Sequence, residues 1–248
     1  MKSIKTISFI IPTFKQGTII LEDIERLDKS LGSTGKNYEI IVVADGFLKD
    51  VEHVLENVKN KKVKLIGYEK NQGKGFAVKY GMLNAKGDVI GFIDAGMDLD
   101  PEEIPFMLNI MEWNNADIVV GSKLHPESKV KYPFIRRVMS WGYRMLTLIL
   151  FGFMVKDTQV GLKIFKKEAA KNIFKRILVK KFAFDVETLA VASTLGYHKI
   201  YEAPIKLNFK KNTIKSLNFW RTIFWMLWDT AAVFYRLRIL HYYDNPHE

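Results

Sequence analysis

Short apolar runs alternate with amphipathic segments along the first half of the chain. The apolar runs have the length of β-strands, are rich in Val and Ile, and fall at residues 6–14, 38–46, 63–69, 88–96 and 116–123. The segments between them have the apolar period of helices and fall at residues 21–31, 48–58, 75–85 and 101–113. Because strands that are apolar on both sides need helices on both faces, this pattern predicts an α/β protein with a Rossmann-like, mostly parallel sheet.

The alternation stops near residue 123. Residues 132–155 have the period of one long helix, 157–174 contain a polar turn followed by a helix, 184–196 indicate a further helix, and 199–209 indicate a strand. Residues 216–243 again have a helical period and combine bulky aromatic residues, among them Trp220, Trp225 and Trp228, with Arg and Asp. Because no linker or repeat separates the two halves, we expect a single domain that ends in amphipathic helices.

Composition narrows the choice of partners. The 248 residues include 38 basic and 27 acidic ones, and the net charge of +11 favours nucleic acid, a phosphorylated small molecule or an acidic membrane surface. The chain has no cysteine, which excludes disulfides, thiolate metal sites and a cysteine nucleophile, and is compatible with a reducing cytosol. No uninterrupted apolar run reaches the roughly 18 residues of a spanning helix, and no secretory signal is recognisable, so surface attachment to a membrane stays open.

Three aspartates crowd the end of the fourth apolar run. The stretch "FIDAGMDLDP" places Asp94, Asp98 and Asp100 within seven positions. Like charges this close repel unless they are solvated, protonated or paired with a cation, so a metal site is one interpretation. The other is that Asp98 and Asp100 cap a helix whose first turn holds Pro101. The local pattern fits both.

Further polar residues follow other predicted strands. They are Thr13, Asp45 and Lys123. In open parallel sheets ligands bind beyond the carboxyl ends of the strands, so we expect these residues and the aspartates to share one site. Taken alone, Asp45 with Gly46 is an ordinary turn, and "NQGKGFA" matches neither the P-loop nor the GxGxxG pattern.

Seven short motifs follow one another along the chain: "IIPTF", "VVADG", "NQGKGFAVKYGM", "FIDAGMDLDP", "VGSK", "DTQVGLKIFK" and "FDVETL". In this order they resemble the family 2 glycosyltransferases of GT-A fold, particularly the branch of dolichol-phosphate mannose synthase and bacterial polyprenyl-phosphate glycosyltransferases. The resemblance covers nearly the whole chain. It implies an inverting transfer of a sugar from a GDP- or UDP-linked donor to a polyprenyl phosphate, with Mg²⁺ or Mn²⁺.

The resemblance also implies an organisation and a location. One catalytic domain over 1–248 would comprise a nucleotide-sugar-binding half at 1–123, an acceptor half at 124–215 and an amphipathic helix at 216–248. The enzyme would be cytoplasmic and peripheral to the inner face of the cell membrane. Basic and aromatic residues near the C-terminus suit a membrane interface, although such a helix can equally pack on the body of the protein.

Positions that match the family's motifs supply the expected site residues. The donor is expected on Pro12, Thr13, Asp45, Lys74, Asp94 and Ala95, and the metal on Asp94 and Asp98. The acceptor phosphate is expected on Lys123, Arg136, Arg137, Gln159 and Lys163. Asp94, Asp98 and Asp157 are the expected catalytic residues, and Asp185 and Glu187 fit either the site or the start of a helix.

The role of Asp157 depends on the acceptor. A phosphate with a second pKa of about 6 is already an anionic nucleophile near neutral pH and needs mainly position and neutralising cations. An alcohol acceptor, such as a saccharide, would need a general base, and Asp157 would be the candidate. The local alternative for Asp157 is a helix N-cap or an Asx-turn.

Several positions depart from the family pattern. Gly96 stands where the second acid of D-x-D is expected, and Ala44 and Phe47 replace polar residues of the acidic turn. Lys15 and Gln16 stand where Asn and Glu are frequent. These departures leave open the nucleotide and the alternative of a catalytically weakened homologue that binds sugar nucleotides. Nucleic acid is not expected as a partner, because the basic residues are spread along the chain without a recognition motif.

Overall fold

The computed structural model describes residues 3–15, 17, 19–56, 58–96, 98–130, 134–152, 155–207 and 219–244, without the side chains of 134–138, 219 and 220. The strands are β1 (Thr6–Thr13), β2 (Asn37–Asp45), β3 (Val63–Tyr68), β4 (Val89–Ile93), β5 (Ile118–Ser122), β6 (Lys129–Val130), β7 (Leu162–Lys166), β8 (Ile200–Pro204) and β9 (Lys206–Leu207). The helices are α1 (Ile19–Gly32), α2 (Leu48–Leu55), α3 (Lys74–Asn84), the 3₁₀-helix η1 (Pro101–Glu103), α4 (Ile104–Trp113), α5 (Phe134–Phe151), α6 (Lys167–Arg176), α7 (Phe184–Thr194) and α8 (Phe219–Arg238).

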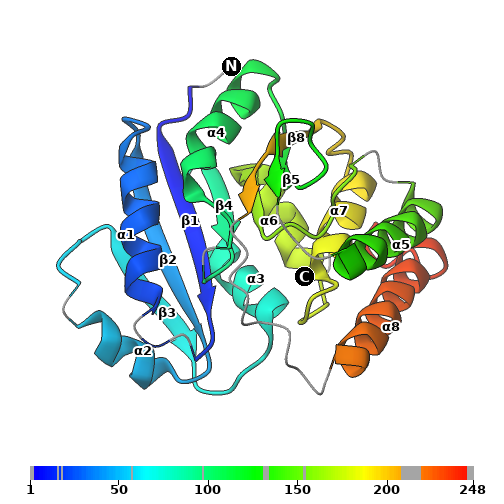
Figure 1. The fold of residues 1–248 in the computed structure, drawn as a ribbon, viewed down its shortest axis with the longest axis horizontal. Helices are drawn as coiled ribbons and strands as arrows, with labels where there is room; N and C mark the ends of the chain where they lie inside the picture. The colour runs from blue at the N-terminus through cyan, green and yellow to red at the C-terminus, as the bar shows by residue number, and fades with distance from the viewer. Residues whose placement is uncertain are drawn as a thin grey trace.

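One sheet joins strands from both halves of the chain, in the order β3-β2-β1-β4-β7-β5-β8. The pairs of β1 with β2 and β4, of β2 with β3 and of β5 with β8 are parallel, and β7 is antiparallel to both of its neighbours. A small second sheet pairs β6 with β9. The prediction of a mostly parallel sheet is confirmed (Figure 1).

Helices cover both faces of this sheet, and the side chains of each strand divide between two cores. Along β1, Phe9 and Ile11 pack in the core that α1, α2 and α4 cover, whereas Ile10 packs in the core beneath α3, α6 and α7. This alternation follows from the two-residue period of a strand. Burial on both faces explains why the strand sequences are almost continuously apolar.

The strand β7 corrects the sequence-based expectation of a turn and a helix over 157–174. The chain is extended over Leu162–Lys166 and lies between β4 and β5, and the helix begins only at Lys167. The expected long helix over 132–155 is also shorter, because it ends at Phe151, and Gly152 takes a left-handed φ of 67°, as residues after a helix often do.

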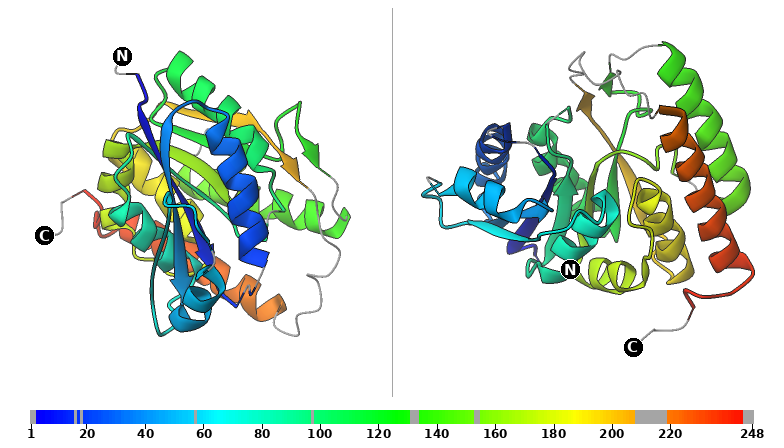
Figure 2. Two further views of the ribbon diagram at one scale, coloured as in Figure 1. Left: turned by 90° about the vertical axis from the view of Figure 1, so that its left-hand side faces the viewer. Right: turned by 90° about the horizontal axis from the view of Figure 1, so that it is seen from below.

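The helices α5 and α8 lie side by side at one end of the molecule (Figures 1 and 2). They are joined by a 2.8 Å hydrogen bond between the hydroxyls of Tyr143 and Thr230 and by the packing of Phe151 on Phe234. Several of their large apolar side chains are nevertheless exposed, including Trp141 (62%), Ile149 (76%) and Trp228 (61%). Within the described ranges, no helix is long and apolar enough to cross a bilayer.

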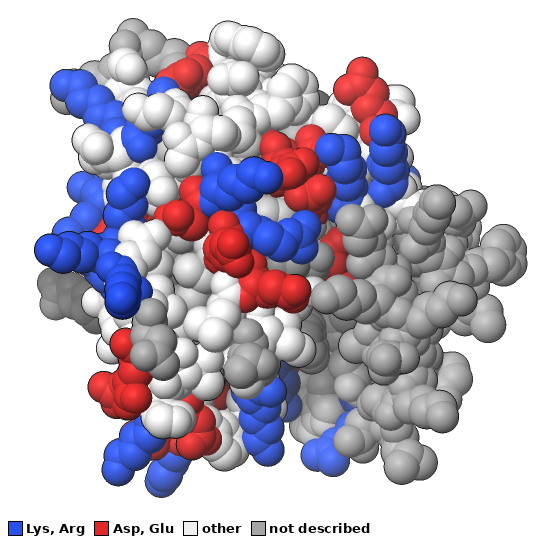
Figure 3. Space-filling view, turned by 60° about the vertical axis from the view of Figure 1, so that its left-hand side comes forward, with Lys and Arg blue, Asp and Glu red and all other residues white. Residues whose placement is uncertain are grey.

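On the face drawn in Figure 3, basic side chains lie among acidic ones. Among the described residues on this face, the basic side chains do not form one continuous patch. A continuous patch or stripe is the usual footprint of a protein that binds nucleic acid through charge.

The C-terminal end of α8 is tied to the core through Glu187 of α7. Oε1 of this buried carboxylate accepts hydrogen bonds from the hydroxyl of Tyr243 at 2.5 Å and from Arg236 at 3.3 Å. Oε2 accepts from the backbone N–H groups of Leu178 and Val179 at 2.9 and 2.7 Å. Glu187, which sequence alone left open between a site and a helix start, therefore links α8 to the segment that precedes α7.

We expect Glu187→Gln to lower the free energy of unfolding by about 2 kcal/mol, because every group around the carboxylate is a donor. Whichever way the new amide turns, its NH₂ group faces either two backbone N–H groups or Tyr243 and Arg236. Urea unfolding followed by circular dichroism measures the change. The control is Glu56→Gln on an exposed helix end, which should be neutral; equal stability of the two variants would contradict the proposed link.

Candidate functional site

Two pockets open at the carboxyl ends of the parallel strands and meet at Asp94 and Ala95, which line both. The first, which we name the sheet pocket, has a volume of about 490 Å³ and lies over the ends of β1, β2 and β4. The second, which we name the helix pocket, has a volume of about 620 Å³ and lies between the end of β4, Lys123 and the helices α5 and α8. Polar residues from separate strands thus meet at the edge where open parallel sheets bind ligands.

All six residues that the resemblance assigned to the donor line the sheet pocket: Pro12, Thr13, Asp45, Lys74, Asp94 and Ala95. Thr13 is the last residue of β1, and its buried Oγ1 has no hydrogen-bond partner in the part of the chain that the structure describes. A buried hydroxyl without a partner is costly unless a ligand or water satisfies it. The sheet pocket therefore offers a ligand at least one free hydrogen-bonding group.

Asp45 holds the loop that leads into α3. Its carboxylate accepts hydrogen bonds from the hydroxyl of Tyr68 at 2.9 Å, from the side chain of Asn71 at 2.8 Å, and from the backbone N–H groups of Gln72 and Gly73. Burial and the adjacent carboxylate raise the pKa of Tyr68, so its hydroxyl remains a donor. Asp45 therefore shapes one wall of the sheet pocket and fixes where Lys74 begins its helix.

Lys74 pairs with Asp94 across the sheet pocket. Its Nζ donates a hydrogen bond to Oδ2 of Asp94 at 2.8 Å and lies 2.7 Å from Oδ1. Oδ1 is buried, and no described residue gives it a hydrogen bond of proper geometry. Burial alone would lower the pKa of Lys74, but the carboxylates of Asp94 and Asp185 outweigh burial and raise it, so the ammonium stays charged.

Gly161 lies directly against the carboxylate of Asp94. A Cβ atom at this position would lie well under 3.0 Å from Cγ and both carboxylate oxygens of Asp94. The two backbones are also tied, because the N–H of Asp94 donates to the carbonyl of Gly161 at 2.9 Å. Only glycine allows this approach, and the carboxylate is held in one place.

The structure separates the three aspartates of "FIDAGMDLDP". Asp100 caps η1, since its side chain accepts the N–H of Glu102 at 3.1 Å, whereas Asp98 lines the helix pocket and Asp94 lines both pockets. The capping interpretation is therefore confirmed for Asp100, whereas a metal at Asp94 and Asp98 stays a prediction. The described residues contain no group of three His, Cys, Asp or Glu side chains that could hold a metal, so a cation here would rest on two carboxylates and on ligand atoms.

The backbone explains why Gly96 occupies the position of the second acid. Its φ of 91° lies in the left-handed region, where any other residue is strained. Its N–H donates to Oδ2 of the buried Asp23 at 2.7 Å, which fixes this turn to α1. The turn after Asp94 therefore depends on glycine for its path.

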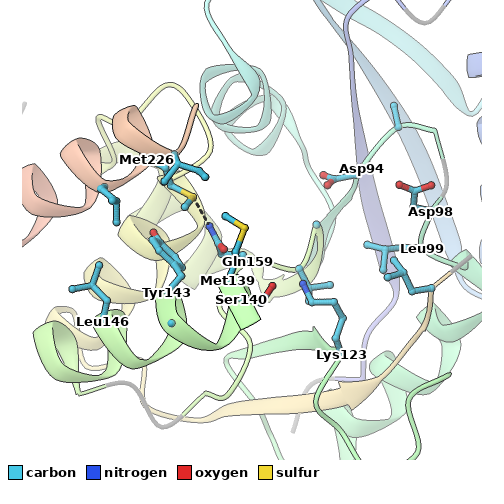
Figure 4. A pocket seen from close by; sticks show the side chains of 17 residues that line it. Asp94, Asp98, Leu99, Lys123, Met139, Ser140, Tyr143, Leu146, Gln159 and Met226 are labelled. Atoms are coloured by element: carbon cyan, nitrogen blue, oxygen red, sulfur yellow. Dashed lines mark hydrogen bonds between the residues drawn. The ribbon is translucent and has the colours of Figure 1, made fainter. Parts of the chain in front are cut away.

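Asp98 and Asp94 lie on the sheet side of the helix pocket, and Gln159 and Met226 lie on its helix side (Figure 4). Lys123 follows β5 and also lines this pocket. The Nε2 of Gln159 donates to the sulfur of Met226 at 3.2 Å, which joins the loop before β7 to α8.

Asp157 is buried behind Lys123, outside the helix pocket itself. Its Oδ2 accepts the backbone N–H of Lys123 at 3.0 Å and lies 3.4 Å from the Nζ, and its Oδ1 accepts the N–H of Gln159 at 3.4 Å. The Asx-turn interpretation is therefore confirmed. The same contacts make Asp157 a positioning residue for Lys123 and Gln159.

The structure corrects the expectation that Lys163 of β7 binds the acceptor phosphate. Lys163 is fully buried, and its Nζ donates to Asp185 and, at 2.7 Å, to the carbonyl of Val160. Burial lowers the pKa of Lys163 and raises that of Asp185. Because it has no exposed surface, Lys163 cannot receive an acceptor phosphate in this structure. The side chains of Arg136 and Arg137 lie outside the described residues.

Other residues of the two pockets were not predicted. Tyr143 and Met226 line the helix pocket, and Phe14, Lys181 and Phe182 line the sheet pocket. Burial raises the pKa of Tyr143 to about 12, so its hydroxyl is protonated at neutral pH. Tyr143 and Met226 lie inside predicted helical periods and carry no sequence signal of a pocket, since packing explains them equally well.

Two residues that depart from the family pattern, Lys15 and Phe47, lie close to Phe14 of the sheet pocket. The rings of Phe14 and Phe47 lie 5.9 Å apart, and the Nζ of Lys15 lies 4.8 Å from the centre of the Phe47 ring. Lys15 and Phe47 both have positive φ, at 53° and 57°. Phe47 therefore packs against Phe14, which lines the sheet pocket, whereas Gln16 lies outside the described residues.

Known proteins resemble this chain in sequence and in fold. A model of the family "Glycosyl transferase family 2" matches residues 8–174. Among curated proteins, the chain is similar to the dolichyl-phosphate beta-glucosyltransferases of Drosophila melanogaster (33% identical, over 67% of this chain and 55% of that protein) and Homo sapiens (33%, over 82% and 64%). The chain thus spans less than two thirds of the length of these relatives.

Solved structures share the fold at lower identity. Glucosyl-3-phosphoglycerate synthase from Mycobacterium tuberculosis has a TM-score of 0.67 and 17% identity over 93% of this chain and 79% of that one. Mannosyl-3-phosphoglycerate synthase from Rubrobacter xylanophilus has a TM-score of 0.68 and 14% identity over 98% and 77%. These likenesses show that the fold is GT-A, and the family match shows that the chain belongs to glycosyl transferase family 2.

Proposed function

We propose that the chain is an inverting glucosyltransferase that moves glucose from UDP-glucose to a polyprenyl phosphate. The observation that carries this proposal is the junction of two pockets at Asp94, one over the strand ends that contains Lys74 and Lys181, the other lined by apolar side chains of α5 and α8. The relatives support the choice of sugar, because they are named glucosyltransferases rather than mannosyltransferases. The solved complexes of the mycobacterial synthase contain UDP, which supports the choice of nucleotide.

The donor would occupy the sheet pocket. Thr13 brings an unsatisfied hydroxyl, Pro12 and Phe14 bring apolar surface for the nucleoside, and Lys74 with Lys181 brings positive charge for the diphosphate. The sugar would then reach Asp94 and Ala95, where the two pockets meet. This order places the reacting carbon of the sugar at the entrance to the helix pocket.

Asp94 and Asp98 fit a divalent cation. Both supply the hard oxygen atoms that Mg²⁺ and Mn²⁺ prefer, and Oδ1 of Asp94 is a buried acceptor that the described residues leave without a hydrogen bond. Structures of the mycobacterial neighbour contain Mn²⁺ or Mg²⁺ with UDP. When bound, such a cation would neutralise the charge of the departing diphosphate.

The acceptor would enter through the helix pocket. Leu146, Ile223 and Leu227 are among the apolar side chains that suit an isoprenoid chain, and Lys123 is the one Lys or Arg among the described residues that line the pocket. Asp157 orients Lys123 from behind. A phosphate oxygen would attack C1 of glucose while the bond from C1 to the diphosphate breaks and UDP leaves with the electron pair. Because the attacking oxygen is already anionic, no general base is needed.

The acceptor is a membrane lipid, so the enzyme would work at a bilayer surface. The exposed side chains of Trp141, Ile149 and Trp228 lie on the two helices that also line the helix pocket. Exposed aromatic and aliphatic groups on such helices suit the boundary between headgroups and acyl chains. We therefore propose that α5 and α8 rest on the membrane, as a peripheral enzyme on the cytoplasmic face requires.

The test is mass-spectrometric detection of product from the purified chain, a panel of UDP- and GDP-sugars, Mg²⁺ or Mn²⁺ and a short polyprenyl phosphate in detergent. We expect glucosyl polyprenyl phosphate from UDP-glucose, and no product with EDTA or with the unphosphorylated polyprenol. Transfer to polyprenol or to a saccharide would replace the proposed acceptor and make a base necessary. Binding of UDP-glucose without product or hydrolysis would favour a catalytically weakened homologue.

A further inference from the structure

The ammonium of Lys74 occupies the carboxylate oxygens of Asp94 that a metal ion would need. The ammonium lies within 2.8 Å of both carboxylate oxygens, so the charge of Asp94 is already balanced without any metal. A divalent cation brought to the same carboxylate would meet this ammonium at close range, and like charges at such distances repel strongly away from bulk water. Cation and ammonium therefore compete for one carboxylate.

The carboxylate of Asp94 is restricted on the side of Gly161. The backbone of Gly161 lies against its carboxylate, and the hydrogen bond from the N–H of Asp94 to the carbonyl of Gly161 fixes the backbone beneath it. Lys74, by contrast, has a side chain with four rotatable bonds and begins its helix at the edge of the sheet pocket. We therefore expect Lys74, rather than Asp94, to move when a cation binds.

Two other anions can take up the ammonium of Lys74. Asp185, the buried partner of Lys163, already interacts electrostatically with Lys74. The diphosphate of a nucleotide would bring further negative charge into the sheet pocket, where Lys74 lines the wall. Without the nucleotide, a cation at Asp94 would leave an excess of positive charge among Lys74, Lys163 and the metal.

We propose that Lys74 is the counter-ion of Asp94 in the donor-free protein and leaves it for the diphosphate, so that the metal binds only together with the nucleotide. The inference rests on the proposed use of a nucleotide donor and a metal, and it deepens that function by assigning Lys74 to the control of metal binding. Lys74 thus controls metal binding through Asp94 without itself being a metal ligand.

The experiment measures Mn²⁺ binding by the loss of the free-ion EPR signal, with and without UDP. For the natural chain we expect UDP to tighten Mn²⁺ binding at least about tenfold. For Lys74→Met we expect Mn²⁺ to bind at least about tenfold more tightly than to the natural chain when UDP is absent. Lys74→Arg keeps the cation and should restore the dependence on UDP.

Lys79→Met is the matched control, because it removes the same charge from the same helix. The ammonium of Lys79 donates to the carbonyl of Ile177 at 2.7 Å rather than to a carboxylate, so this variant should bind Mn²⁺ like the natural chain. Lys74→Gln serves in place of Lys74→Met if thermal unfolding shows that the latter does not fold.

Two results would overturn the role of Lys74: equal Mn²⁺ affinity of the Lys74 and Lys79 variants without UDP, or tight binding of Mn²⁺ to the natural chain without UDP. Binding of UDP itself is measured separately by calorimetry. If UDP binds to no variant, the proposed donor is wrong, while the comparison without nucleotide still decides the role of Lys74. Failure of the inference and failure of the proposed function are therefore distinguishable.

Discussion

Asp94→Asn should reduce the rate of glucosyl transfer about 10³-fold while the protein stays folded. The substitution keeps the size of the side chain and its place against Gly161, but it removes the negative charge at the point where the two pockets meet. A neutral amide is a poor ligand for Mg²⁺ or Mn²⁺, and it also leaves Lys74 without its closest counter-charge. Initial rates of product formation from UDP-glucose measure the effect.

Asp100→Asn is the matched control for Asp94→Asn. It removes one negative charge from the same motif, at a residue that caps η1 and pairs with Arg26 at 3.5 Å. Asn is as good an N-cap as Asp, so stability should change by less than about 1 kcal/mol and transfer should persist. Full activity of Asp94→Asn, or equal losses in both variants, would remove Asp94 from the proposed site.

The strand ends could be predicted because their sequences carry a local signal. Runs such as "SFIIP" and "IIVVAD" are apolar on both faces of a strand, and this fixes a covered parallel sheet and so places Thr13, Asp45 and Asp94 at one edge. The order of the seven motifs further indicated the family. The apolar pattern and the motif order both place the donor-side residues at the same edge of the sheet, and the structure brings these residues together in one pocket.

The antiparallel strand could not be predicted, because its signal depends on a distant partner. The sequence "LKIFKKEAAKNIF" places Lys163 in an apolar run, and a lysine there argues against a buried strand. Only the fold brings Asp185 of α7 against that lysine and makes its burial tolerable. Likewise, the separate roles of Asp98 and Asp100 depend on the path of the turn after β4, which the left-handed φ of Gly96 determines.

The conformation of Gly96 also explains why the absence of the second D-x-D acid need not abolish a metal site. Restoring an aspartate there would place a non-glycine residue at a φ of 91°, which is strained, and would disturb the turn that Asp23 holds. The position is therefore coupled to α1 through the backbone. The proposed metal site on Asp94 and Asp98 is compatible with this turn as it stands, and the test of its metal affinity is the EPR titration with UDP.

Gly161→Ala should reduce transfer about 10²-fold or more, although residue 161 carries no side chain in the natural protein. The new Cβ would overlap the carboxylate of Asp94, and the hydrogen bond between the two backbones prevents them from separating freely. The carboxylate must therefore turn away, which breaks its contact with Lys74 and misplaces the charge at the junction of the pockets. Transfer rates measure this loss, and thermal unfolding measures the accompanying overpacking, for which we expect about 1–3 kcal/mol.

Gly32→Ala separates this effect from a general cost of adding a methyl group. Its Cβ would lie 3.6 Å from the hydroxyl of Tyr38, an ordinary contact at the end of α1 and far from both pockets, so full activity is expected. If Gly161→Ala retained full activity with a normal unfolding temperature, the carboxylate of Asp94 would not need the position seen here. A fixed Asp94 is the common premise of the metal site, of its competition with Lys74 and of transfer at the junction, so this one methyl group tests all three.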